Sequence, residues 1–371
     1  MKHNIEFIGK FFDNHSLSIV NRNLALRLKD KVNLSIIPLD VPSSEFKVNS
    51  DQISMLQPLT KELTETPDIQ LRHSYPPIWK WPEHEKTKVV YIQPWEFMAI
   101  PSEWQYKFDT FADAVITPSN WTAEVYKNSG VNPSRIFVVP NGYDESIFKP
   151  ANNRQDNTVK VVYVGCHQYR KGIDTLLAVW SRATKKGMPI SLTIKDTPQV
   201  YGESELLKDI ITLQYKTGCA EIIYDDSIKS ELEMAKLYQD HHIIIHPYRG
   251  EGFGMHIQEA MACGCIPIVT DGGPTDEFVS ESKIKSSKKI VNLYDIFALK
   301  PEDSASNMGM HKWVLEPDPY NLAQLLQETV TKIKTISVDK TKLTTWETAS
   351  NQYFMALDKV IKIKEKANRL K

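Results

Sequence analysis

The chain has 371 residues, of which 41% are hydrophobic and 25% charged, proportions typical of a folded globular protein. At about 150 residues per domain, this length predicts two domains. Lysine plus arginine number 45 and aspartate plus glutamate number 46. The resulting net charge of -1 leaves no broad basic field, so we expect no nucleic acid partner.

Cysteine usage and hydropathy bear on the location of the protein. The four cysteines include no Cys-x-x-Cys pair and are too few for a disulfide scaffold, which favours a reducing compartment. No segment nears the roughly 18 consecutive apolar residues of a membrane-spanning helix, and residues 1–12 are a poor signal peptide. We expect a cytoplasmic protein, with peripheral contact at the inner face of a membrane left open.

Short β-branched runs alternate with helical stretches, a pattern that predicts parallel sheets covered by helices. The first half, residues 1–150, is expected to form one Rossmann-like α/β domain. Its expected strands are residues 5–8, 34–38, 88–92, 114–117 and 136–140, and its helices cover 18–29 and a segment capped by Ser119 or Asn120. A polar segment, residues 141–157, follows as the linker.

The second half, residues 151–344, predicts a doubly wound domain of the same class. Its expected strands are 159–165, 190–196, 221–224, 242–246 and 266–270, and its helices are 172–186, 204–215, 230–239 and 255–263. Ligands of such a sheet bind at the carboxyl ends of its strands. We therefore expect the two domains to meet across a ligand-binding cleft.

The pattern weakens near the end of the chain. Residues 280–319 predict a loop-rich insertion with a lysine-rich start, and two helices are expected over 320–335 and 345–370. The last helix is basic after Asp358, which could favour an anionic membrane surface. A solvated helix face is the preferred interpretation.

The densest group of candidate functional residues is the string 249–265, which follows a strand and opens a helix. Gly250, Gly252 and Gly254 permit tight turns and close approach to a ligand, while free helix amides attract a phosphate or sugar oxygen. Glu251 and Glu259 are eight positions apart, so they should contact different parts of one extended ligand. The alternative is a plain turn with two solvated carboxylates.

The same string resembles the signature of the family-four retaining glycosyltransferases, also called glycosyl transferases group 1. The resemblance rests on Glu251-Gly252-Phe253-Gly254, Glu259-Ala260-Met261-Ala262-Cys263-Gly264, Pro267 with Val269, and Gly272-Gly273. Residues 162–165, 170–177, 118–119, 140–144 and 148–150 resemble further family segments, and 15–22 and 94–97 resemble a bacterial-type branch. The family implies the GT-B fold: two Rossmann-like domains facing across a cleft, with a last helix, 345–371, crossing back to the first.

The resemblance also implies roles for individual residues in the second domain. Lys171 and Arg170 would stabilise the charge that develops on the departing diphosphate. Many family members have an arginine where this chain has Cys166, and Arg170 could supply that charge instead. Glu251 would lie near the transferred sugar and Glu259 on the nucleotide ribose. The remaining donor-site candidates are Gly252, Phe253, Gly254, Met255, His256 and Gly165, with Gly9 and Ser16 approaching from the first domain.

In the first domain, Glu96, after the strand 88–92, is a further catalytic candidate. The acceptor-side candidates are Gln93, near Glu96, and Arg72 with His73 in a proline-rich loop. The family often places a histidine or an acidic group near positions 93–96. A structural carboxylate is an equal alternative for Glu96, and His73 is preferred as structural. Trp79, Trp81, Trp95 and Trp104 could stack on sugars or pack the first domain.

Metal binding finds little support in the sequence. His242 and His246 share one face of an apolar strand, which favours packing over ligation, and both His-Glu-x-x-His and Asp-x-Asp are absent. We therefore expect no cofactor and no metal requirement, and a retaining transfer of a hexose-type sugar from a nucleoside-diphosphate sugar to a glycan or lipid-linked acceptor. The alternatives are a nucleotide-sugar epimerase and a noncatalytic nucleotide-sugar-binding subunit. The donor base and sugar, the acceptor and the oligomeric state stay open.

Overall fold

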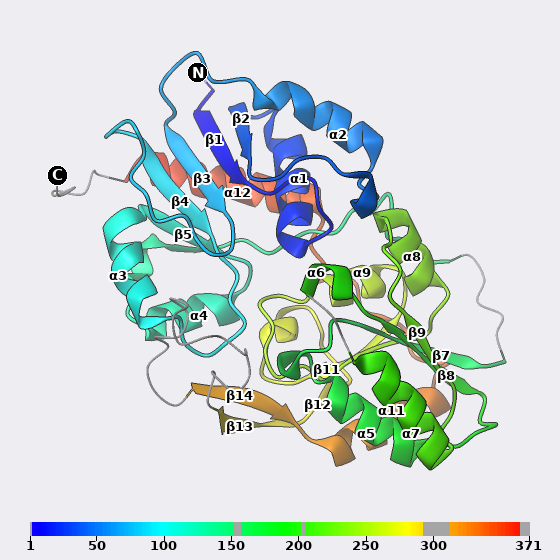
Figure 1. The fold of residues 1–371 in the computed structure, drawn as a ribbon. Coiled ribbons are helices and arrows are strands. Elements are labelled where there is room, and N and C mark those ends of the chain that lie inside the picture. Colours follow the sequence, from blue (N-terminus) through cyan, green and yellow to red (C-terminus); the bar gives the residue numbers. More distant parts are fainter. Residues whose placement is uncertain (1, 152–156, 202–204, 292–311, 364–371) are drawn as a thin grey trace.

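The computed structural model describes residues 2–151, 157–201, 205–291 and 312–363. Two six-stranded parallel sheets form the centres of two domains (Figure 1). Their strand orders are β2-β1-β3-β4-β5-β6 and β12-β11-β10-β7-β8-β9. In each sheet the chain adds strands first toward one edge and then toward the other, while all strands stay parallel. This arrangement confirms the predicted doubly wound α/β class.

In the first domain, helices separate most of the strands along the chain, although β4 follows β3 directly. The strands are β1 (Asn4–Gly9), β2 (Asn33–Pro38), β3 (Ile69–His73), β4 (Lys88–Ile92), β5 (Ala114–Thr117) and β6 (Ile136–Val138). The helices are α1 (Ser16–Leu28), α2 (Ser50–Leu56), α3 (Ser102–Phe111) and α4 (Asn120–Asn128). Ser119 caps α4 as predicted, because its side chain accepts from the amide of Thr122.

The segment expected as a proline-rich loop around Arg72 and His73 is in fact a strand, β3. It lies between β1 and β4, with Ile69 opposite Ile5 and Lys88. Arg72 and His73 are both buried in this strand. The sequence did not predict the strand because it has only five residues and one of them is charged. Their burial bears on the acceptor-side prediction below.

The second domain follows the sequence prediction to within a few residues. Its strands are β7 (Val159–Val164), β8 (Ile190–Lys195), β9 (Ile222–Asp225), β10 (Ile243–His246), β11 (Ile266–Thr270) and β12 (Lys283–Ile284). Its helices are α5 (Ile173–Ala183), α6 (Pro198–Tyr201), α7 (Leu206–Thr217), α8 (Glu231–Gln239), α9 (Met255–Ala262) and α11 (Pro319–Thr331). Strongly apolar strands such as β10, which is buried along its whole length, account for this agreement.

The expected loop-rich insertion contains a β-hairpin. Strand β13 (Ser286–Val291) pairs antiparallel with β14 (Lys312–Pro317), and residues 292–311 lie outside the described part of the chain. On one face of the hairpin the ammonium of Lys288 lies 4.3 Å from the ring centre of Trp313, and on the other face the ammonium of Lys289 lies 3.0 Å from the carboxylate of Glu316. Val314 on this second face is buried in the aromatic core of the first domain, so the hairpin connects the two domains.

The last described helix, α12 (Trp346–Ile361), returns to the first domain (Figure 1). Trp346, Tyr353 and Leu357 are buried in the same core as Phe7 and Leu24. A Cβ on Gly142 would lie 2.4 Å from the amide nitrogen of Trp346, so this crossing requires glycine there. The predicted extension of the helix to residue 370 falls partly on residues 364–371, which are not described.

Other features of the described residues bear on packing and location. Among them, no helix is both long and apolar enough to cross a membrane. Trp95 and Trp104 are buried, and Trp79 packs against the same aromatic core of the first domain. Packing therefore explains most of this tryptophan group.

Candidate functional site

The glycine-rich loop connects the carboxyl end of β10 to the amino end of α9. Gly254 precedes the helix in a left-handed conformation with a φ of 94°, which favours glycine. The amides at the start of a helix have no partner within it, so the amino end of α9 is a suitable place for the predicted anion.

Gly250 and Gly252 meet another requirement, because the first domain packs against them. A Cβ on Gly250 would lie 2.4 Å from the carbonyl oxygen of Glu96, and one on Gly252 would lie 3.3 Å from Cβ of Pro94. The sequence predicted that these glycines allow a ligand to approach the loop, but in the structure it is the first domain that lies against them. The glycines let the turn at residues 94–96 of one domain reach the loop of the other.

Four charged side chains meet at this contact between the domains. The Nζ atom of Lys171 lies 2.5 Å from Oε2 of Glu251, and NH1 of Arg170 lies 3.9 Å from the same oxygen. On its other side, NH2 of Arg170 lies 3.7 Å from Oε1 of Glu96 in the first domain. The structure thus brings together all four predicted catalytic residues: Glu251, Lys171, Arg170 and Glu96.

Ionisation of Glu251 depends on these cations. Burial alone would raise the pKa of this carboxyl group, but Lys171 and Arg170 hold it well below its ordinary value. Glu251 is therefore a carboxylate at neutral pH, and it fixes the ammonium of Lys171 in the site.

Glu259 has the opposite protonation behaviour although it lies in the same motif. It is buried in α9, and burial raises the pKa of its carboxyl group to about 8, assisted by the negative charge of Glu231. A hydrogen bond with Tyr238 opposes part of this shift. Glu259 is thus neutral at pH 7, so its carboxyl group can both donate to and accept from a hydroxyl group.

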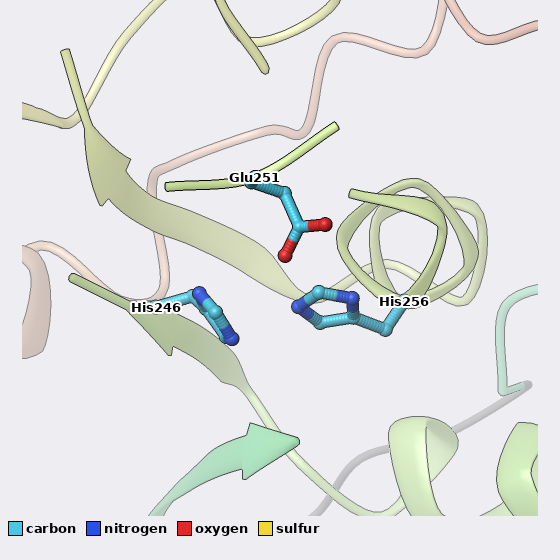
Figure 2. A group of neighbouring side chains, drawn as sticks. All are labelled: His246, Glu251 and His256. Atoms are coloured by element: carbon cyan, nitrogen blue, oxygen red, sulfur yellow. The ribbon is translucent and has the colours of Figure 1, made fainter. Parts of the chain in front are cut away.

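Two histidines face Glu251 from below the loop (Figure 2). One ring nitrogen of His246, one of His256 and a carboxylate oxygen of Glu251 all lie within 4.8 Å of one another. His246 stacks on Tyr163, with ring centres 5.0 Å apart. Burial, followed by the charge of Lys171, lowers the pKa of His256 to about 3, and burial with the neighbouring His256 keeps the pKa of His246 well below its ordinary value.

The histidine pair weighed in the sequence as a metal site does not converge. Nδ1 of His242 accepts from the amide of Lys160, and it is His256 that joins His246. These groups are chemically suitable metal ligands. Lys171, however, already contacts the carboxylate of Glu251, so a divalent cation would have to displace or repel its ammonium group.

Arg249, which the sequence left without a role, braces the residues that carry the two cations. Its guanidinium binds Asp174 at 2.7 Å and Glu316 at 2.8 Å and lies 3.9 Å from the ring centre of Tyr169. Tyr169 begins the short 3₁₀ turn Tyr169–Lys171. The sequence could not predict this role of Arg249, because its partners Asp174 and Glu316 come from distant segments of the chain.

Of the residues predicted in the first domain, Glu96 lies at the charged group, whereas Arg72 and His73 are part of the packed interior. The guanidinium of Arg72 donates to the carbonyl oxygens of Ile78 and Lys80, at 2.8 and 2.6 Å. Nδ1 of His73 lies 2.6 Å from Oδ1 of Asn21. Both residues are buried packing elements, which corrects their placement in a cleft-facing loop.

Several other predicted residues have clear positions. Gly9 lies against Asn21, and a Cβ there would come within 2.4 Å of its Nδ2 atom. Ser16 begins α1 behind the cap His15, whose Nδ1 accepts from the amide of Leu17. The ring of Phe253 packs on Phe278.

The remaining candidates lie in the second domain, except Gln93, which is buried in the first. Gly165 lies beside His246, and Met255 is the first residue of α9. The thiol of Cys166 is buried near Lys171 and Arg170.

Two family models match most of the chain. Residues 144–296 match the model described as Glycosyl transferases group 1, and residues 60–147 match Glycosyltransferase Family 4. HepE of Anabaena, solved with UDP and glucose, superimposes with a TM-score of 0.66 at 12% identity, covering 96% of this chain and 99% of that one. The fold is thus the GT-B fold of glycosyltransferases. The second domain matches the group 1 glycosyltransferase model and the first domain the family 4 model, in line with the resemblance of the sequence motif.

The curated relatives match only part of the chain. One subunit of the phosphatidylinositol N-acetylglucosaminyltransferase of Arabidopsis thaliana is 21% identical over 63% of this chain and 46% of its own length. A GDP-mannose:cellobiosyl-diphosphopolyprenol alpha-mannosyltransferase of Xanthomonas oryzae is 29% identical over 41% of this chain and 39% of its own length. The chain therefore matches less than half the length of these relatives.

Glu259→Gln tests the protonation of the buried carboxyl group. Because the pKa of Glu259 is raised from 4.5 to about 8, its stabilising contribution is complete below pH 4.5 and is lost as the pH rises through 8. Glutamine does not ionise. We expect the unliganded variant to match wild type in melting temperature at pH 5 and to exceed it by several degrees at pH 9. Exposed Glu221→Gln is the control, and parallel pH profiles for Glu259→Gln and wild type would contradict the assignment.

Proposed function

We propose that the protein transfers a hexose-type sugar from a nucleoside-diphosphate sugar to a glycan or lipid-linked acceptor, with retention at the anomeric carbon. The observation that carries this proposal is the joint placement of Lys171, Arg170 and Glu251 at the amino end of α9. The names of the Xanthomonas relative and of the Anabaena complex support a nucleotide-sugar donor.

The two cations account for departure of the nucleotide. When the glycosidic bond to phosphate breaks, negative charge grows on the leaving diphosphate. Lys171, Arg170 and the amides that begin α9 stabilise this charge where it develops. Glu251 holds Lys171 in position before the donor arrives, so little reorganisation is needed during the reaction.

The two glutamates suit different parts of the donor. Ionised Glu251 lies beside the cations, where it can accept from a hydroxyl of the transferred sugar and stabilise positive charge at its anomeric carbon. Neutral Glu259 lies farther along α9 and can exchange hydrogen bonds with the ribose hydroxyls. Retention requires the acceptor to attack from the face that the diphosphate leaves.

The name of the Arabidopsis relative, which describes one chain of a multi-chain enzyme, favours a second candidate: a donor-binding chain that works within an assembly. An assay of the purified chain with labelled nucleotide sugars distinguishes the two. Turnover by the chain alone supports the first proposal, whereas donor binding without turnover supports the second.

Replacement of the charged pair tests the proposed site. We expect Lys171→Met and Glu251→Gln to lower kcat/KM for sugar transfer by about 10²–10³-fold, the usual effect of removing a charge-stabilising group. Lys208→Met, an exposed lysine on α7, is the matched control and should retain wild-type activity. The measurement is the initial rate of transfer by folded variants. Wild-type rates for both Lys171→Met and Glu251→Gln would exclude the assignment.

Metal removal tests the role of the cations. Because Lys171 and Arg170 already provide positive charge at Glu251, we expect dialysis against EDTA to leave the transfer rate unchanged. Addition of Mg²⁺, Mn²⁺ or Zn²⁺ should give no stimulation. A rate that falls with EDTA and returns with one of these ions would contradict this expectation and would make the His246, Glu251 and His256 group a candidate to hold the ion.

A further inference from the structure

The start of α4, in the first domain, contacts the glycine-rich loop between β10 and α9 of the second domain through two hydroxyl groups. Oγ of Ser119 and Oγ1 of Thr122 lie 3.0 and 3.1 Å from the carbonyl oxygen of Gly252 and 2.9 Å from each other, and Oγ1 of Thr122 also lies 3.4 Å from the carbonyl oxygen of Trp95. Each hydroxyl has one proton, and for both of them the carbonyl oxygen of Gly252 is within hydrogen-bond distance. Both side chains are fully buried, and Gly252 is buried as well. A buried carbonyl that loses such donors loses stabilisation that water does not replace.

These hydrogen bonds act directly beside Glu251. The amide of Gly252 donates to Oε1 of Glu251 at 3.2 Å, while its carbonyl oxygen accepts from the first domain. Gly252 is therefore held on one side by the carboxylate and on the other by α4. Movement of α4 away from the loop would break the hydrogen bonds to the carbonyl oxygen of Gly252 and leave the one from its amide to Glu251.

A second contact fixes the same turn of α4. The carboxylate of Glu277 accepts from Nδ2 of Asn120 at 3.0 Å and from the amide of Trp121 at 3.1 Å. The indole of Trp121 donates to the carbonyl oxygen of Gly272 at 3.2 Å. A carboxylate at a helix amino end is favourable, so the start of α4 is anchored to the second domain at several points.

We propose that Ser119 and Thr122 are positioning residues for the reaction: they set the Glu251 loop against the first domain, so that the site is complete only when the domains are together. This inference rests on the proposed transferase function. Nucleotide binding uses groups of the second domain, whereas transfer also needs the acceptor domain. Loss of the Thr122 hydroxyl should therefore reduce turnover more than nucleotide affinity.

Thr122→Val is the sharpest variant, because Ser119 also caps α4 and its loss would weaken the helix. Thr122→Ser restores the hydroxyl. Thr87→Val is the matched control: Thr87 is fully buried, donates to the carbonyl oxygen of Pro67 at 2.7 Å, and lies at the amino end of β4, away from the site. We expect Thr122→Val to lower kcat about tenfold, the effect of one buried hydrogen bond, while the Kd for nucleoside diphosphate stays within about twofold.

Thr122→Ser should recover most of the rate, and Thr87→Val should retain it. Wild-type kcat in Thr122→Val, no recovery in Thr122→Ser, or an equal loss in Thr87→Val would overturn the proposal. Hydrogen exchange gives a readout that survives failure of the transferase assignment. In a chain without transfer activity, faster exchange over residues 250–256 in Thr122→Val alone would support the positioning role, and identical exchange in all variants would refute it.

Discussion

The buried ion pair between Glu251 and Lys171 is the interaction on which the site depends. A carboxylate in this buried position would be neutral without a cation, and a buried cation would be equally costly alone. Each residue therefore fixes the charge and the place of the other. Arg170 extends the pair to Glu96 and so links the charge of the second domain to the first.

The surrounding structure keeps this pair in one geometry. Arg249 braces the 3₁₀ turn that carries both cations, and the glycines at 250 and 252 admit the backbone of the opposite domain. The Ser119 and Thr122 hydroxyls support the loop from the other side. Residues from both domains therefore determine where the carboxylate of Glu251 lies, so the proposed site depends on both sheets.

Local patterns in the sequence predicted much of this arrangement. Strongly apolar strands and capped helices set the second domain, and the motif from Glu251 to Gly264 identified both glutamates. The strand with Arg72 and His73 and the β13–β14 hairpin escaped prediction because their charged residues are buried or stacked only in the tertiary structure. The contacts of Arg249 and Thr122 join residues far apart in the chain, so no local pattern could reveal them.

The central claim is that Lys171, held by Glu251, receives the diphosphate of the donor. The most direct measurement is the melting-temperature shift produced by UDP, GDP or ADP, since a ligand that binds the folded state stabilises it. The comparison is between wild type and the double variant Lys171→Met with Glu251→Gln, which leaves no unpaired buried charge. A large shift in wild type with at least one nucleotide, and most of it lost in the double variant, is the result expected. Equal shifts in both proteins would contradict the account.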